Sequence, residues 1–222
     1  MTTSNSSIVI TPGVGETTAT HTALSKKHQV VMLADDRGNL AGTMDTYSYI
    51  VPSTAVGANK LFLDLFNAAG SGKIIRVTSV RPIVDTDVAV VGAVGIRLLL
   101  FRTSAVGTGG TASAYKSATA DVAGGTITPQ DTANPALPAQ ITARHLPTAG
   151  ATPAEWLRGM YVMGEESANS FAYNFQGQVN MLDLDSETAQ LLTLREGQGL
   201  LIKQGAIASV GSVRFRVTFT VE

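Results

Sequence analysis

The last ten residues of the chain alternate between apolar and polar side chains. Arginine or threonine separates five apolar residues that occupy every second position: Val213, Phe215, Val217, Phe219 and Val221. A period of two is typical of a β-strand with one buried face, and an α-helix does not produce it. The sequence therefore predicts a C-terminal strand and, by the same rhythm elsewhere, an all-β fold.

Similar runs recur along the chain, separated by glycine, proline and other turn-forming residues. They predict further strands at Ser7–Thr11, Gln29–Ala34, Thr46–Val51, Lys60–Asn67, Lys73–Ile83, Gly95–Thr103, Ser170–Val179 and Gly199–Gln204. Short strands at this spacing favour an antiparallel sandwich or barrel. A jelly roll, in which eight strands form two sheets, is the preferred architecture.

Local signals add three expectations. The glycine-rich residues 68–72 predict a hairpin between Lys60–Asn67 and Lys73–Ile83, and Pro82 is expected to end its second strand because proline cannot donate to a ladder. Thr152 and Pro153 predict the start of one or two helical turns. The stretch Ser186–Leu194 fits either a short helix or a strand.

The domain organisation is predicted from the segments in which the alternation of apolar and polar residues is weak or absent. Residues 1–7 are predicted to be a flexible N-terminal arm, and residues 8–222 a single β-sandwich domain. Residues 103–153 are rich in Gly, Ala, Thr, Ser and Pro, and predict a long irregular excursion between core strands. Loops of that length in a compact domain usually have a function.

Charge and composition exclude several classes of protein. The 16 basic and 17 acidic residues give a net charge of −1, which disfavours nucleic-acid binding. No apolar run approaches the roughly 20 residues of a membrane span. Cysteine is absent, which excludes disulfides and thiolate metal sites. The first seven residues lack the features of a secretory signal.

Candidate reactive groups form no recognisable constellation. The histidines, His21, His28 and His145, lack the spacing of a zinc site, and no strained nucleophile motif is present. Four acid pairs could serve acid–base chemistry or a weak calcium site, but solvated turns are the preferred interpretation: Asp35/Asp36, Asp85/Asp87, Glu165/Glu166 and Asp183/Asp185. The sequence therefore predicts no enzyme, no catalytic residue, no cofactor and no bound metal.

Two other groups of residues allow two interpretations each. Arginines within strand patterns would form the wet face of a sheet, or pair with acids on a neighbouring subunit: Arg76, Arg97, Arg102, Arg214 and Arg216. The cluster Trp156, Met160, Tyr161 and Met163 would pack in the core, or anchor an interface, where such side chains are enriched.

Three segments resemble virion proteins of tailed bacteriophages. They are Thr11–Glu16 with the following residues 19–20 and 28–31, then Leu61–Lys73 leading into Arg76 and Val77, and finally Gly109–Thr111 together with Leu194–Leu200. These are turn-and-strand patterns without catalytic residues. The resemblance implies a structural protein of the phage particle, assembled in the host cytoplasm and located in the virion.

The preferred hypothesis is a capsid decoration or cement protein that stabilises the head. Its expected partners are copies of itself, with a trimer as one option, and virion proteins such as the major capsid protein. The resemblance leaves head, neck and tail open. The alternative is a tail- or fibre-associated protein that binds a host surface glycan, and an enzyme such as a glycosidase is the third hypothesis.

Overall fold

The chain divides by its internal contacts into two units, Met1–Met44 and Asp45–Glu222. In the first unit, β1 (Thr18–Ala23) and β2 (Lys26–Val31) form an antiparallel two-stranded sheet. The computed structural model describes residues 18–23, 26–31, 44–84, 92, 95–116, 124–148, 153, 155–163, 180–182 and 190–222.

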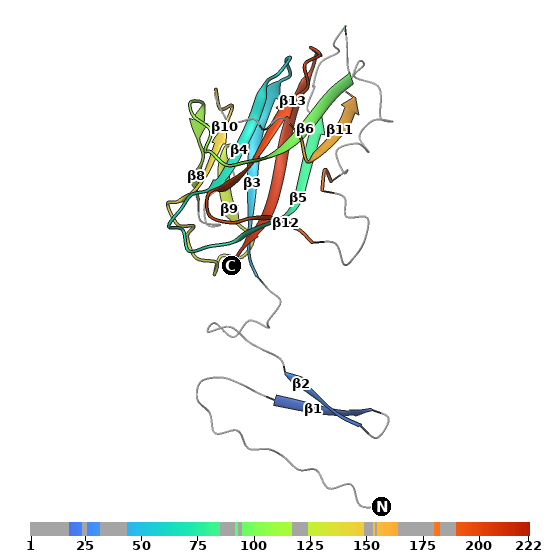
Figure 1. The fold of residues 1–222 in the computed structure, drawn as a ribbon, viewed down its shortest axis with the longest axis vertical. Coiled ribbons are helices and arrows are strands. Elements are labelled where there is room, and N and C mark those ends of the chain that lie inside the picture. Colours follow the sequence, from blue (N-terminus) through green and yellow to red (C-terminus); the bar gives the residue numbers. More distant parts are fainter. Residues whose placement is uncertain are drawn as a thin grey trace, which may run out of the picture. The chain divides into compact units, whose positions relative to one another are not determined.

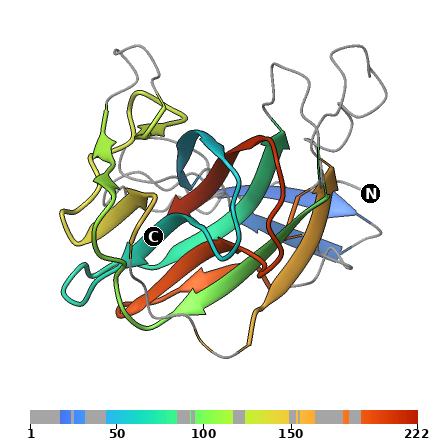
Figure 2. The ribbon, with the colours of Figure 1, turned by 90° about the horizontal axis from the view of Figure 1, so that it is seen from above.

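The second unit contains two six-stranded sheets that face each other as two layers (Figure 1, Figure 2). One, here called the β14 sheet, has the order β12-β5-β14-β3-β9-β8, and the other, the β13 sheet, has the order β11-β6-β13-β4-β10-β7. The strands are β3 (Asp45–Ala55), β4 (Leu61–Asn67), β5 (Ile75–Val84), β6 (Gly95–Thr103), β7 (Thr111–Ala112), β8 (Ala114–Tyr115), β9 (Thr126–Pro129), β10 (Ile141–His145), β11 (Arg158–Met163), β12 (Leu192–Leu194), β13 (Gln198–Gln204) and β14 (Ser212–Val221).

The two sheets form a β-sandwich. Within them, every described pair of neighbouring strands is antiparallel except β8 and β9. No helix occurs among the described residues. Accordingly, the described part of the chain contains no helix that is long and apolar enough to cross a lipid bilayer. The all-β expectation is therefore confirmed.

The core lies between the two sheets and is built by alternate residues of their inner faces. In β14, the five alternating apolar residues are buried and the arginines between them are exposed, as the sequence predicts. The largest fully buried side chains come from both layers and include Tyr47, Tyr49, Phe62, Phe215, Phe219, Leu63 and Leu65. The ring of Phe215 in β14 lies 5.2 Å from that of Phe62 in β4, so aromatic contacts join the layers.

The predicted hairpin between β4 and β5 is wrong, because the two strands belong to different sheets. Residues 68–74 instead carry the chain from one layer to the other. Gly70 and Gly72 do adopt the positive φ angles, +81° and +63°, that such a turn requires. The Glu196 carboxylate accepts a hydrogen bond of 2.7 Å from the Gly72 amide, which fastens this connection to the loop before β13.

Pro82 does not end its strand, contrary to the expectation, because β5 continues to Val84. On one side, β14 pairs with β5 along its length, and Phe215 lies opposite Pro82. On the other side, β12 pairs only with residues from Ile75 to Val77. Pro82 therefore lies beyond the reach of β12, where a missing donor breaks no ladder.

The sandwich strands begin at Asp45, whereas the sequence starts the domain at residue 8. Residues 1–7 and the expected strands Ser7–Thr11 and Ser170–Val179 lie outside the described residues. The expected strand Gln29–Ala34 overlaps β2, which pairs with β1 and with neither sandwich sheet.

The described part of the excursion at residues 103–153 contains four short strands, β7 to β10. They extend the two sheets on one side, since β10 and β7 follow β4 while β9 and β8 follow β3. A helical turn was expected to start at Thr152. The residues described there, Pro153 and Glu155 to Leu157, are not helical. Within Ser186–Leu194, residues Leu192–Leu194 form β12.

Gly199 in β13 provides a local test of the packing on the outer side of the β13 sheet. A Cβ atom at Gly199 would lie 2.5 Å from the Phe66 ring, 2.7 Å from the Thr103 hydroxyl and 3.0 Å from a backbone carbonyl oxygen. Gly199→Ala is therefore expected to lower the free energy of unfolding by about 1–3 kcal/mol, measured by urea denaturation. The matched control is Gly95→Ala in β6, where a Cβ atom meets nothing within 4 Å.

Candidate functional site: the exposed edge of strand β11

Strand β11 is the outermost strand of the β13 sheet. It pairs with β6, and no other described strand pairs with its far edge. An edge strand presents unpaired backbone groups, which proteins usually protect or use for association. The side chains around this edge therefore indicate which of the two applies.

The edge carries a group of large apolar side chains that are open to solvent. Trp156 and Leu157 directly precede β11, and their exposed fractions are 44% and 42%. Tyr161 and Met163 lie within it, at 68% and 39%. We call these four residues the β11 patch. Val162, between the last two, is buried in the core, so the alternation of the strand directs the aromatic and thioether groups outward.

The two aromatic rings of the β11 patch flank the guanidinium group of Arg97. Arg97 lies opposite Tyr161 in the β6–β11 ladder, and its guanidinium carbon is 6.0 Å from the centre of that ring. The same carbon is 5.8 Å from the centre of the Trp156 ring. These distances are typical of cation–π contacts.

The Trp156 ring packs against the backbone of Gly159, which has no side chain to displace it. A Cβ atom at Gly159 would lie 3.1 Å from the Trp156 ring and 3.3 Å from Leu99. The ring therefore packs where a side chain of β11 would otherwise stand. Below it, Leu99, Phe101 and Leu201 form a small buried cluster on the outer side of the β13 sheet.

This arrangement is suited to binding a surface. Trp, Tyr and Arg are the residue types that dominate the energetics of protein interfaces. A group of exposed large apolar side chains around one strand often marks an interaction site. The core-packing interpretation of Trp156, Tyr161 and Met163 is therefore wrong, and it holds for Met160 alone, which packs partly buried against the core.

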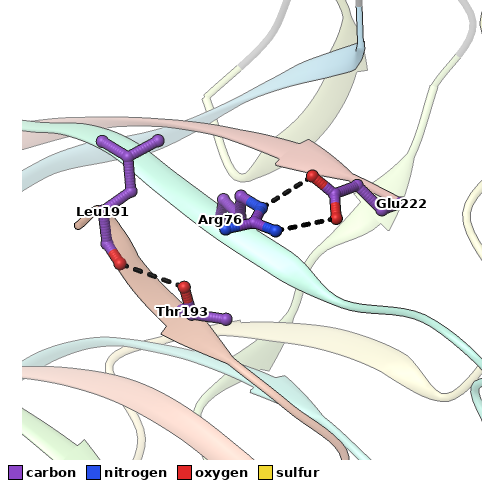
Figure 3. Close-up of polar contacts among 4 residues, drawn as sticks. All are labelled: Arg76, Leu191, Thr193 and Glu222. Carbon is purple, nitrogen blue, oxygen red and sulfur yellow. Dashed lines mark hydrogen bonds and ion pairs between the residues drawn. The ribbon is translucent and has the colours of Figure 1, made fainter. Parts of the chain in front are cut away.

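The arginines singled out in the sequence do not form one row. Arg76 in β5 is paired within the chain, where its Nε donates to Glu222 Oε1 at 2.6 Å and its Nη2 to Oε2 at 3.0 Å (Figure 3). This hydrogen-bonded ion pair lowers the pKa of Glu222. Arg214 and Arg216 lie exposed on the outer side of the β14 sheet, and Arg102 lines a cleft at the end of the sandwich.

The predicted acid pairs and two of the histidines contribute nothing to this site. All four acid pairs lie outside the described residues, so their calcium and acid–base interpretations stay predictions. His21 and His28 are opposite each other in the β1–β2 ladder. His145 shares a hydrogen bond of 2.9 Å with Thr54, and burial together with Lys60 lowers its pKa. Among the described residues, no three potential metal ligands come together.

Asp64 is a buried carboxyl group that the sequence analysis did not single out. It lies in β4 between the core residues Leu63 and Leu65, so alternation places it on the outer side of the β13 sheet. Oδ2 accepts a hydrogen bond of 3.2 Å from the Gly107 amide, and Oδ1 has no partner. Burial raises the pKa of Asp64 to about 6, against the opposing effects of Gly107 and Arg144. The sequence did hold a signal for this buried carboxyl group, namely an acidic residue within an otherwise apolar strand.

Other features of the molecule left no signal in the sequence. Arg97 becomes part of the candidate site only because β6 and β11, far apart along the chain, are paired.

No protein-family model, curated protein or solved structure matches this chain.

Proposed function

We propose that this chain is a structural subunit of a tailed-bacteriophage particle and acts as a capsid decoration or cement protein. The proposal starts from the turn-and-strand resemblance of three segments to phage virion proteins. The observation that carries it further is the β11 patch, in which exposed aromatic side chains lie against an arginine at the outermost described strand of the β13 sheet. A protein that binds over a shell of other subunits needs such a surface.

The order of strands supports a jelly roll as the finer description of the sandwich. The chain alternates between the sheets from β3 to β6, and again from β11 to β14. The resulting orders are β12-β5-β14-β3 in one layer and β11-β6-β13-β4 in the other. Two four-stranded sheets interleaved in this way are the pattern of two Greek keys. The four short strands β7 to β10 are then an insertion in the middle of the roll.

The expected partners are copies of this chain and a major shell protein, and the expected location is the virion. Contact through the β11 patch would bury the exposed rings of Tyr161 and Trp156. In a twofold-symmetric dimer the same surface of both copies meets, so one patch on each subunit suffices, whereas a trimer needs a second, complementary surface on each copy.

Replacing Tyr161 by serine is expected to weaken this association at least tenfold, because aromatic anchors at an interface centre commonly contribute about 2 kcal/mol or more. The association would be measured by sedimentation of the full chain alone and by its binding to particles that lack it. The thermal midpoint should stay within about 2 °C of the wild-type value, since Tyr161 is 68% exposed.

The matched control is Ile207→Ser, which removes another exposed apolar side chain, 76% exposed, from the loop between β13 and β14. It should leave association unchanged. A strictly monomeric wild-type protein that is also absent from purified virions would contradict the proposed function.

A glycan-binding role in the tail or fibre is the second candidate. The exposed rings of Trp156 and Tyr161 favour it, because sugars stack on aromatic faces. A glycan array probed with the full chain and with Tyr161→Ser separates the two roles. Specific glycan signals lost in the variant would favour the tail role, and their absence would favour subunit contact.

A further inference from the structure

A cleft of about 400 Å³ opens between the two sheets at one end of the sandwich, and of the β11 patch only Leu157 lines it. Its floor is apolar and contains Val77 of β5 and Leu100 of β6, both fully buried. Leu182 also lines it and is 7% exposed. The size and the apolar floor are typical of pockets for small ligands.

Two arginines reach this cleft from positions that belong to the inner face of the β13 sheet. Leu98 and Leu100 of β6 are buried in the core, and Arg102 is the next residue on the same side. Arg158 of β11 lies directly opposite Leu100. Residues so placed are diagonal neighbours, with backbones roughly 7–8 Å apart. Charged groups therefore stand where the alternation would otherwise continue the apolar core.

A third arginine approaches from the other layer. Arg195 follows β12 directly and lines the same cleft. The polar groups beside it are engaged locally, since Gln198 Oε1 accepts from the Arg195 amide at 3.0 Å. The Thr193 hydroxyl donates to the Leu191 carbonyl at 3.0 Å (Figure 3). The side-chain amides of Gln190 and Gln198 also line the cleft, and the three guanidinium groups are its charged donors.

None of these three guanidinium groups has a hydrogen-bond or ion-pair partner within the described part of the chain. Arg76 and Arg97 differ from them, because the first pairs with Glu222 and the second stacks on two rings. All three arginines are exposed, so their mutual repulsion around the cleft carries a cost that water partly screens. A bound anion would remove that cost.

We propose that this cleft binds a small amphiphilic oxyanion, meaning a carboxylate or phosphate group joined to a short apolar chain. The planar guanidinium forks of Arg102, Arg158 and Arg195 match both head groups bidentately. The apolar tail would lie against the leucines of the lining that are open to solvent, Leu157, Leu191 and Leu192. A concave site favours a small ligand over the flat surface of a protein partner. The inference does not depend on the proposed virion role.

The test is an NMR titration of the full chain with hexanoate and with hexyl phosphate. Saturable shifts centred on residues 102, 158 and 195 are expected, with a Kd of about 1 mM or tighter for a ligand of this size. Arg102→Gln and Arg158→Gln should each weaken binding about tenfold, since a charge-assisted hydrogen bond is lost. The matched control is Arg216→Gln, an exposed arginine outside the cleft, which should bind as the wild type does.

Three results would overturn the proposal. Equal binding of hexanol would mean that the arginines do not take part. Binding of an acidic peptide without binding of either small probe would assign the cleft to a protein partner. Binding of the probes only after the changes Asp183→Asn, Asp185→Asn and Glu187→Gln would mean that the arginines serve acids of the chain itself.

Discussion

Phe215→Ala is expected to lower the free energy of unfolding by about 3–5 kcal/mol, the usual cost of deleting a buried phenyl ring. Phe215 is 1% exposed and lies in β14, at the centre of its sheet. Its ring meets Phe62 of the opposite layer at 5.2 Å, so the cavity would open between the two sheets. The measurement is equilibrium denaturation in urea, with folding of the variant checked by circular dichroism.

The neighbouring residue gives the control. Arg216 points to the outer side of the same strand and is exposed. Arg216→Ala should change the free energy of unfolding by no more than about 0.5 kcal/mol. Equal effects at the two positions would contradict the two-residue alternation on which the sandwich rests.

Asp64→Asn is expected to make stability less dependent on pH. The pKa of Asp64 is about 6 in the folded protein against an ordinary 3.8, which corresponds to roughly 3 kcal/mol. Because the folded state holds this proton more tightly than the unfolded state, stability is lost as pH rises from about 4 through 6. Asparagine has no carboxyl proton to lose. The free energy of unfolding of the variant, relative to that of the wild type, should therefore rise by up to roughly 3 kcal/mol between pH 4 and pH 8.

Denaturation curves of both proteins at pH 4, 6 and 8 measure this difference. His145 also titrates differently when folded, but it is present in both proteins and cancels in the comparison. A second variant, Arg144→Gln, removes a charge that lowers the pKa of Asp64, so its stability should depend on pH more steeply than that of the wild type. A difference between Asp64→Asn and wild type that is the same at pH 4 and pH 8 would refute the assignment.

Strand positions could be predicted where an alternating run was long. Gly95–Thr103 matches β6, and Gly199–Gln204 lies within β13. Within the excursion, β7 and β8 were missed because they have two residues each, too few to show a period. The reach of β5 past Pro82 was also missed, since only the pairing partner determines whether a lost donor matters.

The candidate sites depended on contacts between distant segments. Trp156 and Tyr161 could be named from the sequence as either core or interface, and only their exposed fractions decided between the two. Arg102, Arg158 and Arg195 come from three strands or strand ends, and their common cleft exists because β6, β11 and β12 meet at one end of the sandwich. No local pattern carries that information.

The sequence by itself determined the two-residue rhythm, and with it the all-β class and the division of β14 into buried and exposed faces. This is because side-chain alternation is a local property of extended backbone. Only the tertiary structure decided that β4 and β5 lie in different sheets, that Asp64 is buried and that three arginines share a cleft. These features depend on which strands become neighbours, and burial over the whole sandwich, not the composition of any one segment, selects those neighbours.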